Sequence, residues 1–147
     1  QNRQSDISFS WEKMLNFEGN SAPYLMYAHA RLKSILREVP RFSSGRSDKI
    51  SESFEVGSLA TDADLALILK LLQFPDVIAR IITDYFPHHL TDYLFALSQE
   101  ANRFYHKEPV LKAEPDVRAA RLRLVAATAE ILKTGLNLLG IEALEKM

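Results

Sequence analysis

The chain has no cysteine, and this absence excludes several chemistries at once. Without a thiol it holds no disulfide framework, no cysteine nucleophile and no zinc site with cysteine ligands. Its first residues, QNRQSDIS, contain no hydrophobic signal segment, and no apolar run approaches the roughly 18 residues that span a membrane. We therefore expect a protein of the cytoplasm with no membrane partner.

Glycine and histidine are few, and they are spread along the chain. The five glycines are scattered, so neither a phosphate-binding loop nor a dinucleotide fingerprint is present. Adjacent His88 and His89 cannot both face one ion from a helix, and His29 and His106 lie far away in sequence. No pairing of nucleophile and base stands out either. We predict no catalytic residue, no metal site and no cofactor site in this chain, which leaves a small-molecule enzyme without support.

An excess of basic residues is also lacking. The chain carries 18 lysines and arginines against 19 acidic residues, for a net charge of −1, whereas charge-driven nucleic-acid binding favours a strongly basic domain. Arg118, Arg121 and Arg123 are interpreted as a solvated helix face with room for one or two phosphate contacts. Asp62 and Asp64 are interpreted as favourable charges in the first turn of a helix. Any partner must be recognised by specific side chains.

What the sequence does contain is helical periodicity interrupted by proline. Apolar residues recurring every three to four positions predict a last short helical piece in the tail and helices over residues 23–37, 62–74, 76–86, 88–105 and 117–133. The charged, serine-rich stretch 41–58 is predicted to be one long polar loop. We predict an all-α bundle of about five or six helices, forming a single domain over residues 1–147.

Two glycines near the end of the chain mark helix boundaries in this pattern. Gly135 is predicted to bend or end the helix that begins near residue 117. Gly140 is predicted to occupy the C′ position after a helix, with Ile141 as its hydrophobic companion. Further upstream, leucine and isoleucine repeat at helical spacing at positions 65, 68, 69 and 72.

Residues 22–37, APYLMYAHARLKSILR, carry two distinct faces on one predicted helix. One arc of about 100° holds the apolar side chains that a domain buries: Leu25, Ala28, Leu32, Ile35 and Leu36. A neighbouring arc of about 80° holds Tyr24, Tyr27, Arg31 and Ser34. Rings and a guanidinium one turn apart suit a planar, anionic ligand such as a nucleotide. Ordinary half-buried tyrosines beside a surface arginine would give the same pattern.

Three stretches of the sequence, taken in order, are similar to one known family. They read ISFSWEKMLNFEGNSAPYLMYAHARLKSILR, LTDYLFALSQEANRFYHKEPVL and VRAARLRLVAATAEILKTGLNLLGIEALEKM. Together they resemble, in order and over nearly the whole chain, the C-terminal anticodon-binding domain of class I arginyl-tRNA synthetases, named after an Asp-Ala-Leu-Arg motif. The resemblance implies an all-helical domain that grips the anticodon stem and loop of arginine tRNA. Only the stretch 41–58 lies outside it.

The resemblance also implies what this chain leaves to the rest of a longer enzyme. In the family, a separate upstream domain activates arginine with ATP and magnesium. The His-x-Gly-His type ATP motif of that domain does not occur here. The chain is therefore expected to be a fragment that does not charge tRNA by itself and that needs no cofactor of its own. We expect it to be a monomer.

Carried over residue by residue, the resemblance implies anticodon contacts at four positions. They are Tyr27 and Arg31 in the YAHAR run, Tyr105 in RFYHKEP, and the last residue, Met147. Tyr24 shares the face of Tyr27 and is kept as a fifth candidate. Arginine codons share a middle G, so their tRNAs share a central anticodon C, which a domain reading all of them must hold. Proteins read such single-stranded bases by stacking them on aromatic rings.

Some assignments near these positions depend on local reasoning. Neighbouring helix positions diverge by about 100°, so we assign Phe104 to the core and Tyr105 to RNA. Two residues depart from the family's pattern: Phe86 stands where an acidic residue is usual, and Leu144 stands where a proline is usual. Leu144 belongs to the tail that delivers Met147.

The alternative function is a helical docking module. It would use the same aromatic face as a hot spot for a partner helix. Such a module would bind a protein with weak salt dependence and with no preference for tRNA. RNA binding, in contrast, weakens as salt rises, because phosphate contacts release counterions.

Overall fold

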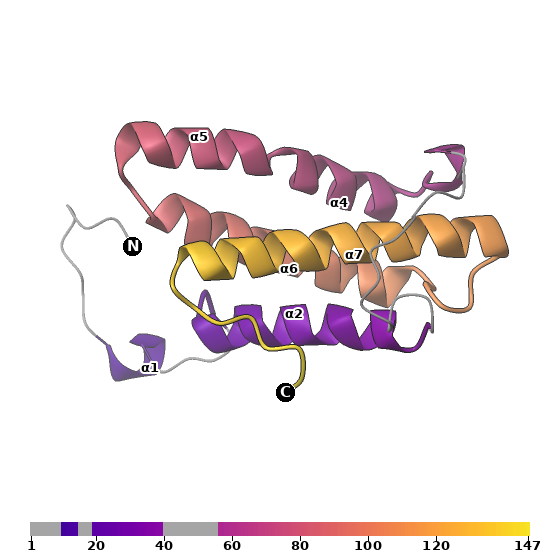
Figure 1. Ribbon diagram of the computed structural model, residues 1–147, viewed down its shortest axis with the longest axis horizontal. Helices are drawn as coiled ribbons and strands as arrows, with labels where there is room; N and C mark the ends of the chain where they lie inside the picture. Colours follow the sequence, from indigo (N-terminus) through magenta and orange to yellow (C-terminus); the bar gives the residue numbers. More distant parts are fainter. Residues whose placement is uncertain (1–9, 15–18, 40–55) are drawn as a thin grey trace.

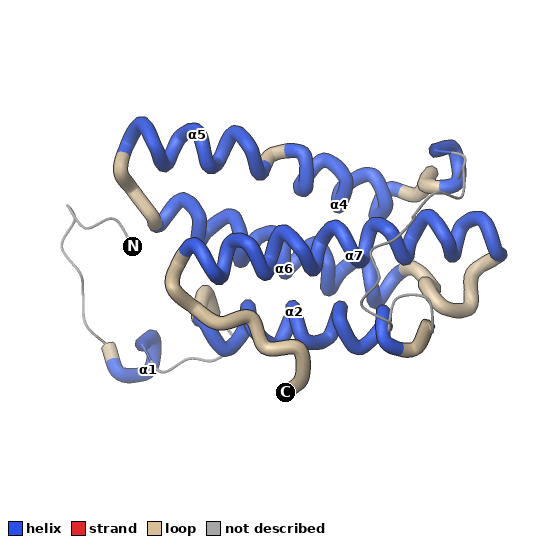
Figure 2. Tube along the Cα trace, viewed as in Figure 1, coloured by secondary structure: helices blue, strands red, loops and turns tan. Residues whose placement is uncertain are grey.

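The computed structural model describes residues 10–14, 19–39 and 56–147, and this part of the chain is helical without any strand (Figure 2). Five helices are long: α2 (Ala22–Arg37), α4 (Asp62–Leu72), α5 (Phe74–Asp84), α6 (His88–Lys107) and α7 (Pro115–Leu138). Two short elements are α1 (Trp11–Met14) and the 3₁₀ helix η1 (Val56–Ser58). The all-α prediction is confirmed. Most of the predicted polar loop, residues 41–55, lies outside the described residues.

The helices pack in layers around one core (Figure 1). Helix α2 packs against α6 and α7, and α4 packs on the other side of α6 and α7. Helix α5 packs mainly against α6 and contributes no fully buried residue. The helices that supply buried residues are therefore α2, α4, α6 and α7, fewer than the five or six helices predicted for the bundle.

Local sequence signals set the starts of α2 and α4. The Ser21 hydroxyl accepts a hydrogen bond from the Tyr24 backbone N–H at 3.4 Å, and a proline lies in the first turn of α2. At α4, Thr61 and Asp64 form a capping box in which each side chain accepts from the other's backbone N–H. These contacts satisfy backbone donors that a helix start leaves free.

Helix α7 does not end at Gly135, as the sequence pattern suggested, but runs on to Leu138. A Cβ atom at Gly135 would lie 2.5 Å from Leu94 Cδ2, so the missing side chain lets α7 approach α6 closely. After the helix, Gly140 has φ of +75°. Ile141 N–H donates to the Leu136 carbonyl at 2.9 Å, and Gly140 N–H donates to the Asn137 carbonyl at 3.0 Å. This is the predicted C′ glycine, but residues 141–147 beyond it are not helical, in contrast to the predicted last helical piece.

The leucine repeat of α4 faces a different direction from the helix's buried side. Leu65, Leu69 and Leu72 are exposed. The buried residues of this helix are Ala63, Asp64 and Leu67. The repeat therefore indicates the helix correctly, but of its four members only Ile68 packs against the core.

Candidate nucleic-acid interface

Helix α2 presents the two faces that its sequence predicts. All five residues of the predicted apolar arc are buried: Leu25, Ala28, Leu32, Ile35 and Leu36. On the neighbouring arc, the Tyr27 side chain is 54% exposed, Ser34 is exposed and Arg31 is half-buried. The polar face of α2 is thus open to a ligand.

A contact between helices fixes the arginine on this face. The Arg31 guanidinium carbon lies 4.4 Å from the centre of the Tyr105 ring, which comes from α6. Phe104 is buried and Tyr105 is 39% exposed, so the assignment of Phe104 to the core is confirmed. A cation over a ring face is attracted by the ring's quadrupole, and a guanidinium also stacks flat on it. Tyr105 therefore helps to hold the guanidinium of Arg31 in place.

The C-terminal tail brings a third element to the same place. Figure 1 shows the tail running from the end of α7 across α2. Met147 is 68% exposed. It lines a hollow of about 210 Å³ whose walls are Tyr27, Ala30, Arg31, Ser34, Arg37, Lys146 and Met147. Residues of α2 and of the C-terminal tail thus line one hollow.

A second hollow lies on the other side of Arg31. Its volume is about 270 Å³, and it is lined by Arg31, Ser34, Ile35, Glu38, Tyr105, Glu108, Pro109, Val110, Leu111 and Lys112. The two hollows share Arg31 and Ser34. Each is several times the roughly 30 Å³ that a water molecule occupies in the liquid. We call the group formed by Tyr27, Arg31, Tyr105 and Met147 the Arg31 surface.

Tyr24, the fifth candidate, has a different environment. Its ring packs against Phe95 with ring centres 5.3 Å apart. Its hydroxyl accepts a hydrogen bond from Asn102 Nδ2 at 3.0 Å. Tyr24 is half-buried and lines neither hollow. Four of the five candidates therefore come together, and a contact of Tyr24 with a ligand stays a prediction.

Contacts that the sequence reasoning missed hold the tail against α2. His29 Nδ1 lies 2.8 Å from the Leu144 carbonyl oxygen, and Arg37 Nη1 donates to the Glu145 carbonyl oxygen. Lys33 Nζ lies 3.2 Å from Glu145 Oε1, and its hydrogen bond and charge lower the pKa of that carboxyl. Burial lowers the pKa of His29, although its bond to Leu144 acts in the opposite direction. The spacing of His29, Lys33 and Arg37, four residues apart, was the available signal.

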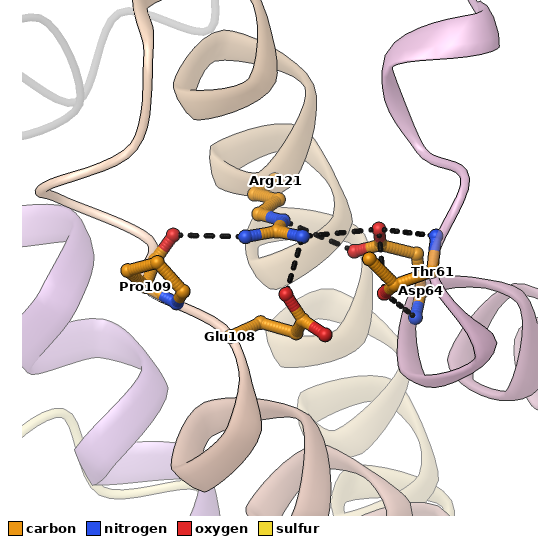
Figure 3. A network of polar contacts seen from close by, with 5 residues as sticks. All are labelled: Thr61, Asp64, Glu108, Pro109 and Arg121. Carbon is orange, nitrogen blue, oxygen red and sulfur yellow. Dashed lines mark hydrogen bonds and ion pairs between the residues drawn. The ribbon is translucent and has the colours of Figure 1, made fainter.

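Arg121 is not on a solvated face, and the prediction for it is wrong. Its side chain is buried on α7 and makes four hydrogen bonds (Figure 3). Nε and Nη2 donate to the Asp64 carboxylate at 3.1 and 3.2 Å, Nη1 donates to the Pro109 carbonyl at 3.1 Å, and Nη2 donates to Glu108 Oε2. Arg121 lies four residues before Val125, on the core stripe of α7, which was the signal for burial. Asp64 accordingly does more than favour a helix start, because it also pairs with Arg121.

Within residues 10–14, 19–39 and 56–147, no three histidine, aspartate or glutamate side chains come together as metal ligands would. Phe86, where the family has an acidic residue, packs its ring 5.4 Å from His88 and 6.0 Å from His89. None of the helices in the described part has the length and apolar character needed to cross a membrane.

The chain is similar to a known protein family and to several curated proteins. Residues 25–147 match the model of a family described as the DALR anticodon binding domain. Curated relatives named Arginine–tRNA ligase include those of Laribacter hongkongensis, 47% identical over 99% of this chain, and Synechocystis, 46% identical over 100% of it. This chain covers 24% of each relative, so it spans about a quarter of their length.

The solved structures that superpose on this chain are also arginyl-tRNA synthetases. The arginyl-tRNA synthetase of Thermus thermophilus superposes with a TM-score of 0.76 at 36% identity, over 96% of this chain and 24% of its own. The arginyl-tRNA synthetase of Plasmodium falciparum superposes with a TM-score of 0.77 at 30% identity, over 100% of this chain and 25% of its own.

Proposed function

The chain belongs to the DALR anticodon-binding domain family, and on this premise we propose that its Arg31 surface binds the anticodon loop of arginine tRNA. The relatives that support the choice of tRNA are named Arginine–tRNA ligase. The observation that carries the proposal is the grouping of Tyr27, Arg31 and Met147 around one hollow, with Tyr105 stacked behind Arg31. Three separate segments of the chain supply these side chains.

The chemistry of the surface fits an unstacked RNA base. Single-stranded bases are held by stacking on aromatic rings and on guanidinium planes. Arg31 offers such a plane, backed by Tyr105, and Tyr27 offers an open ring. Met147 adds a flexible, polarizable side chain that can cover a base from a third direction. Within the part of the chain that the structure describes, the Arg31 side chain makes no hydrogen bond or ion pair, which suits donation to a base or a phosphate.

The base that this surface would hold is the central one of the anticodon. Arginine tRNAs share a C at that position, and the neighbouring positions vary among them. A small set of fixed contacts around one base, with looser contacts beside it, is what reading all of these tRNAs requires. The two hollows on either side of Arg31 provide room for one tightly held base and one loosely held neighbour.

For the parent protein we propose the activity of its relatives, attachment of arginine to tRNA. Activation of arginine with ATP and magnesium would belong to a separate upstream domain, and the present chain would hold the anticodon arm while that domain works. The same proposal places the protein in the cytoplasm, where translation occurs, and treats residues 1–147 as one domain that acts as a monomer.

The test is a titration of the chain with an arginine-tRNA anticodon stem-loop and with the same stem-loop carrying the central C changed to A, each at two salt concentrations. We expect tighter binding to the C form, weakening as salt rises because phosphates are neutralised. Tyr27→Ala should weaken binding of the C form by about tenfold, since loss of base stacking costs about 1 to 3 kcal/mol. Leu69→Ala, at an exposed apolar residue of α4, is the matched control and should bind normally.

Equal affinity for the two stem-loops, or binding to neither, would overturn the proposal. Weak salt dependence with no tRNA preference would instead be the behaviour of a docking module for a protein partner.

A further inference from the structure

Three residues of α2 at successive four-residue intervals, His29, Lys33 and Arg37, contact the C-terminal tail. They form a stripe beside the one that carries Tyr27, Arg31 and Ser34. One stripe of the helix therefore holds the tail, and the adjacent stripe, together with Arg37, lines the hollow that the tail's last residue also lines. We call His29, Lys33 and Arg37 the tail clamp.

His29 is the buried member of the tail clamp. Its side chain is 1% exposed, and its Nδ1 lies 2.8 Å from the Leu144 carbonyl oxygen. A carbonyl oxygen can only accept a hydrogen bond, so Nδ1 carries a proton. Burial lowers the pKa of His29 and so favours the neutral ring, in which Nε2 is bare. That Nε2 is buried and finds no partner in the described part of the chain. The ring's one hydrogen bond among these residues is thus the bond to the tail.

The other two members of the tail clamp bind the next residue of the tail. Arg37 donates to the backbone carbonyl of Glu145, and Lys33 pairs with the Glu145 carboxylate at 3.2 Å. Two of the three contacts use backbone carbonyls, which every residue type possesses, proline included. The contact with His29 uses the backbone carbonyl of Leu144, so leucine at this position makes the same hydrogen bond that proline would make.

The distance from the tail clamp to Met147 is short. Met147 lies two residues beyond Glu145, and two extended residues span at most about 7 Å. Once Glu145 is fixed on α2, the short chain to Met147 keeps this residue near Tyr27 and Arg31. If the tail were free from Ile141 onward, its last residue could move by about 20 Å.

We propose that the tail clamp positions Met147, so that the base-binding hollow is already assembled before RNA arrives. This inference rests on the proposed function. Ordering a segment in advance raises affinity, because binding then no longer has to fix it. His29 is a positioning residue: it is buried and lines neither hollow, so it cannot touch the RNA and acts only through the tail.

A double-mutant cycle tests the tail clamp. The affinity for the central-C stem-loop is measured for the chain, for His29→Leu, for the chain lacking Met147, and for the combination. We expect His29→Leu to weaken binding by about tenfold, as follows if the tail occupies its bound position one time in ten. In the chain lacking Met147, His29→Leu should change affinity by less than about twofold, because coupled residues are not additive. His29→Gln, which retains an N–H donor, should restore most of the affinity.

Two results would overturn the inference while leaving the proposed function intact. One is an equal loss from His29→Leu with and without Met147, which would mean that His29 only supports the fold. The other is unchanged affinity in folded His29→Leu. Absence of selective binding by the unmodified chain would instead refute the proposed function itself.

A second measurement does not depend on any variant. The backbone order of residues 144–147 is measured by NMR relaxation on the unmodified chain without RNA. The tail clamp predicts order parameters at Leu144 and Glu145 close to the value of about 0.85 that is typical of rigid backbone. Values below about 0.6 would show a free tail and would contradict the clamp.

Discussion

Two arginines of this chain, Arg31 and Arg121, occupy opposite kinds of environment. Arg121 is 5% exposed, and its guanidinium donates to Asp64, Glu108 and the Pro109 carbonyl. Arg31 is half-buried and lies over the Tyr105 ring, and its side chain makes no hydrogen bond or ion pair with another described residue. An arginine that donates to buried acceptors on several sides stabilises a fold. One that lies over a ring and donates to no described acceptor is, under the proposed function, the one that a ligand contacts.

The two arginines are nevertheless connected. Glu108, which pairs with Arg121, also lines the larger hollow beside Arg31. Pro109 does the same, through a carbonyl bonded to Arg121. The buried network of Figure 3 therefore fixes one wall of the candidate interface. Glu108 and Pro109, in the loop after α6, therefore contact the buried Arg121 and also line the candidate interface.

The largest expected effect separates the two arginines by stability. Arg121→Met should lower the free energy of unfolding by about 3 to 5 kcal/mol, because it leaves the buried Asp64 carboxylate without its cation. Arg31→Met should cost no more than about 1 kcal/mol, the value of an exposed cation–π contact. Urea denaturation of both variants and the unmodified chain provides the measurement. Similar losses in the two variants would remove the distinction.

RNA affinity, unlike stability, should depend mainly on Arg31. Arg31→Met is expected to weaken binding of the central-C stem-loop by about tenfold, because a stacking plane and its charge are lost. Arg31→Lys keeps the charge but not the plane, and should recover only part of the affinity. Arg118→Met, an exposed arginine of α7, is the control for general loss of charge. If it weakens binding as much as Arg31→Met does, the contact at Arg31 is not specific.

Substitution of Tyr105, which packs on Arg31, should lower RNA affinity less than substitution of Arg31 itself. Tyr105→Ala removes the ring under Arg31 and should weaken binding by about two- to fivefold, since an exposed cation–π contact is worth about 0.5 to 1 kcal/mol. Tyr105→Phe keeps the ring face and should bind within about twofold of the unmodified chain. Stem-loop titrations of both variants check this. A large loss in Tyr105→Phe would assign the role to the hydroxyl instead of the ring.

The smallest effect concerns pH and the tail clamp. Burial lowers the pKa of His29 below its ordinary value of 6.5. The unfolded chain therefore binds this proton at a higher pH than the folded chain, so the free energy of unfolding falls as pH drops from about 6.5 to the folded-state pKa. Urea denaturation at several pH values should show this decline, and His29→Gln should reduce it. An unchanged decline in His29→Gln would assign it to other groups.

Much of the fold could be predicted from local patterns. The two faces of α2 follow largely from helical spacing, because the apolar arc is buried and Tyr27 and Ser34 of the second arc are exposed, although Tyr24 of that arc packs against the core. The C′ role of Gly140 follows from its place after an apolar helix. Gly135 shows where this reasoning fails. The approach of Leu94, 41 residues away in sequence, makes a glycine necessary there, and no local pattern contains that fact.

The residues of the candidate site could be named from the sequence, but the residues that hold them in position could not. Tyr27, Arg31, Tyr105 and Met147 were all named from the sequence, but through a resemblance, since their spacing also fits ordinary packing. The burial of Arg121 depends on carboxylates from α4 and from the loop after α6, which only the tertiary structure brings together. The tail clamp likewise joins residues more than 100 positions apart.

The most direct measurement follows the guanidinium NMR signals of Arg31 and Arg121 in one arginine-labelled sample during titration with the two stem-loops. The proposed function predicts that the Arg31 signal shifts with the central-C stem-loop and much less with the central-A form, while the Arg121 signal stays in place with both. An unmoved Arg31 signal at saturating RNA, or equal shifts with the two stem-loops, would contradict the claim that the Arg31 surface reads the anticodon.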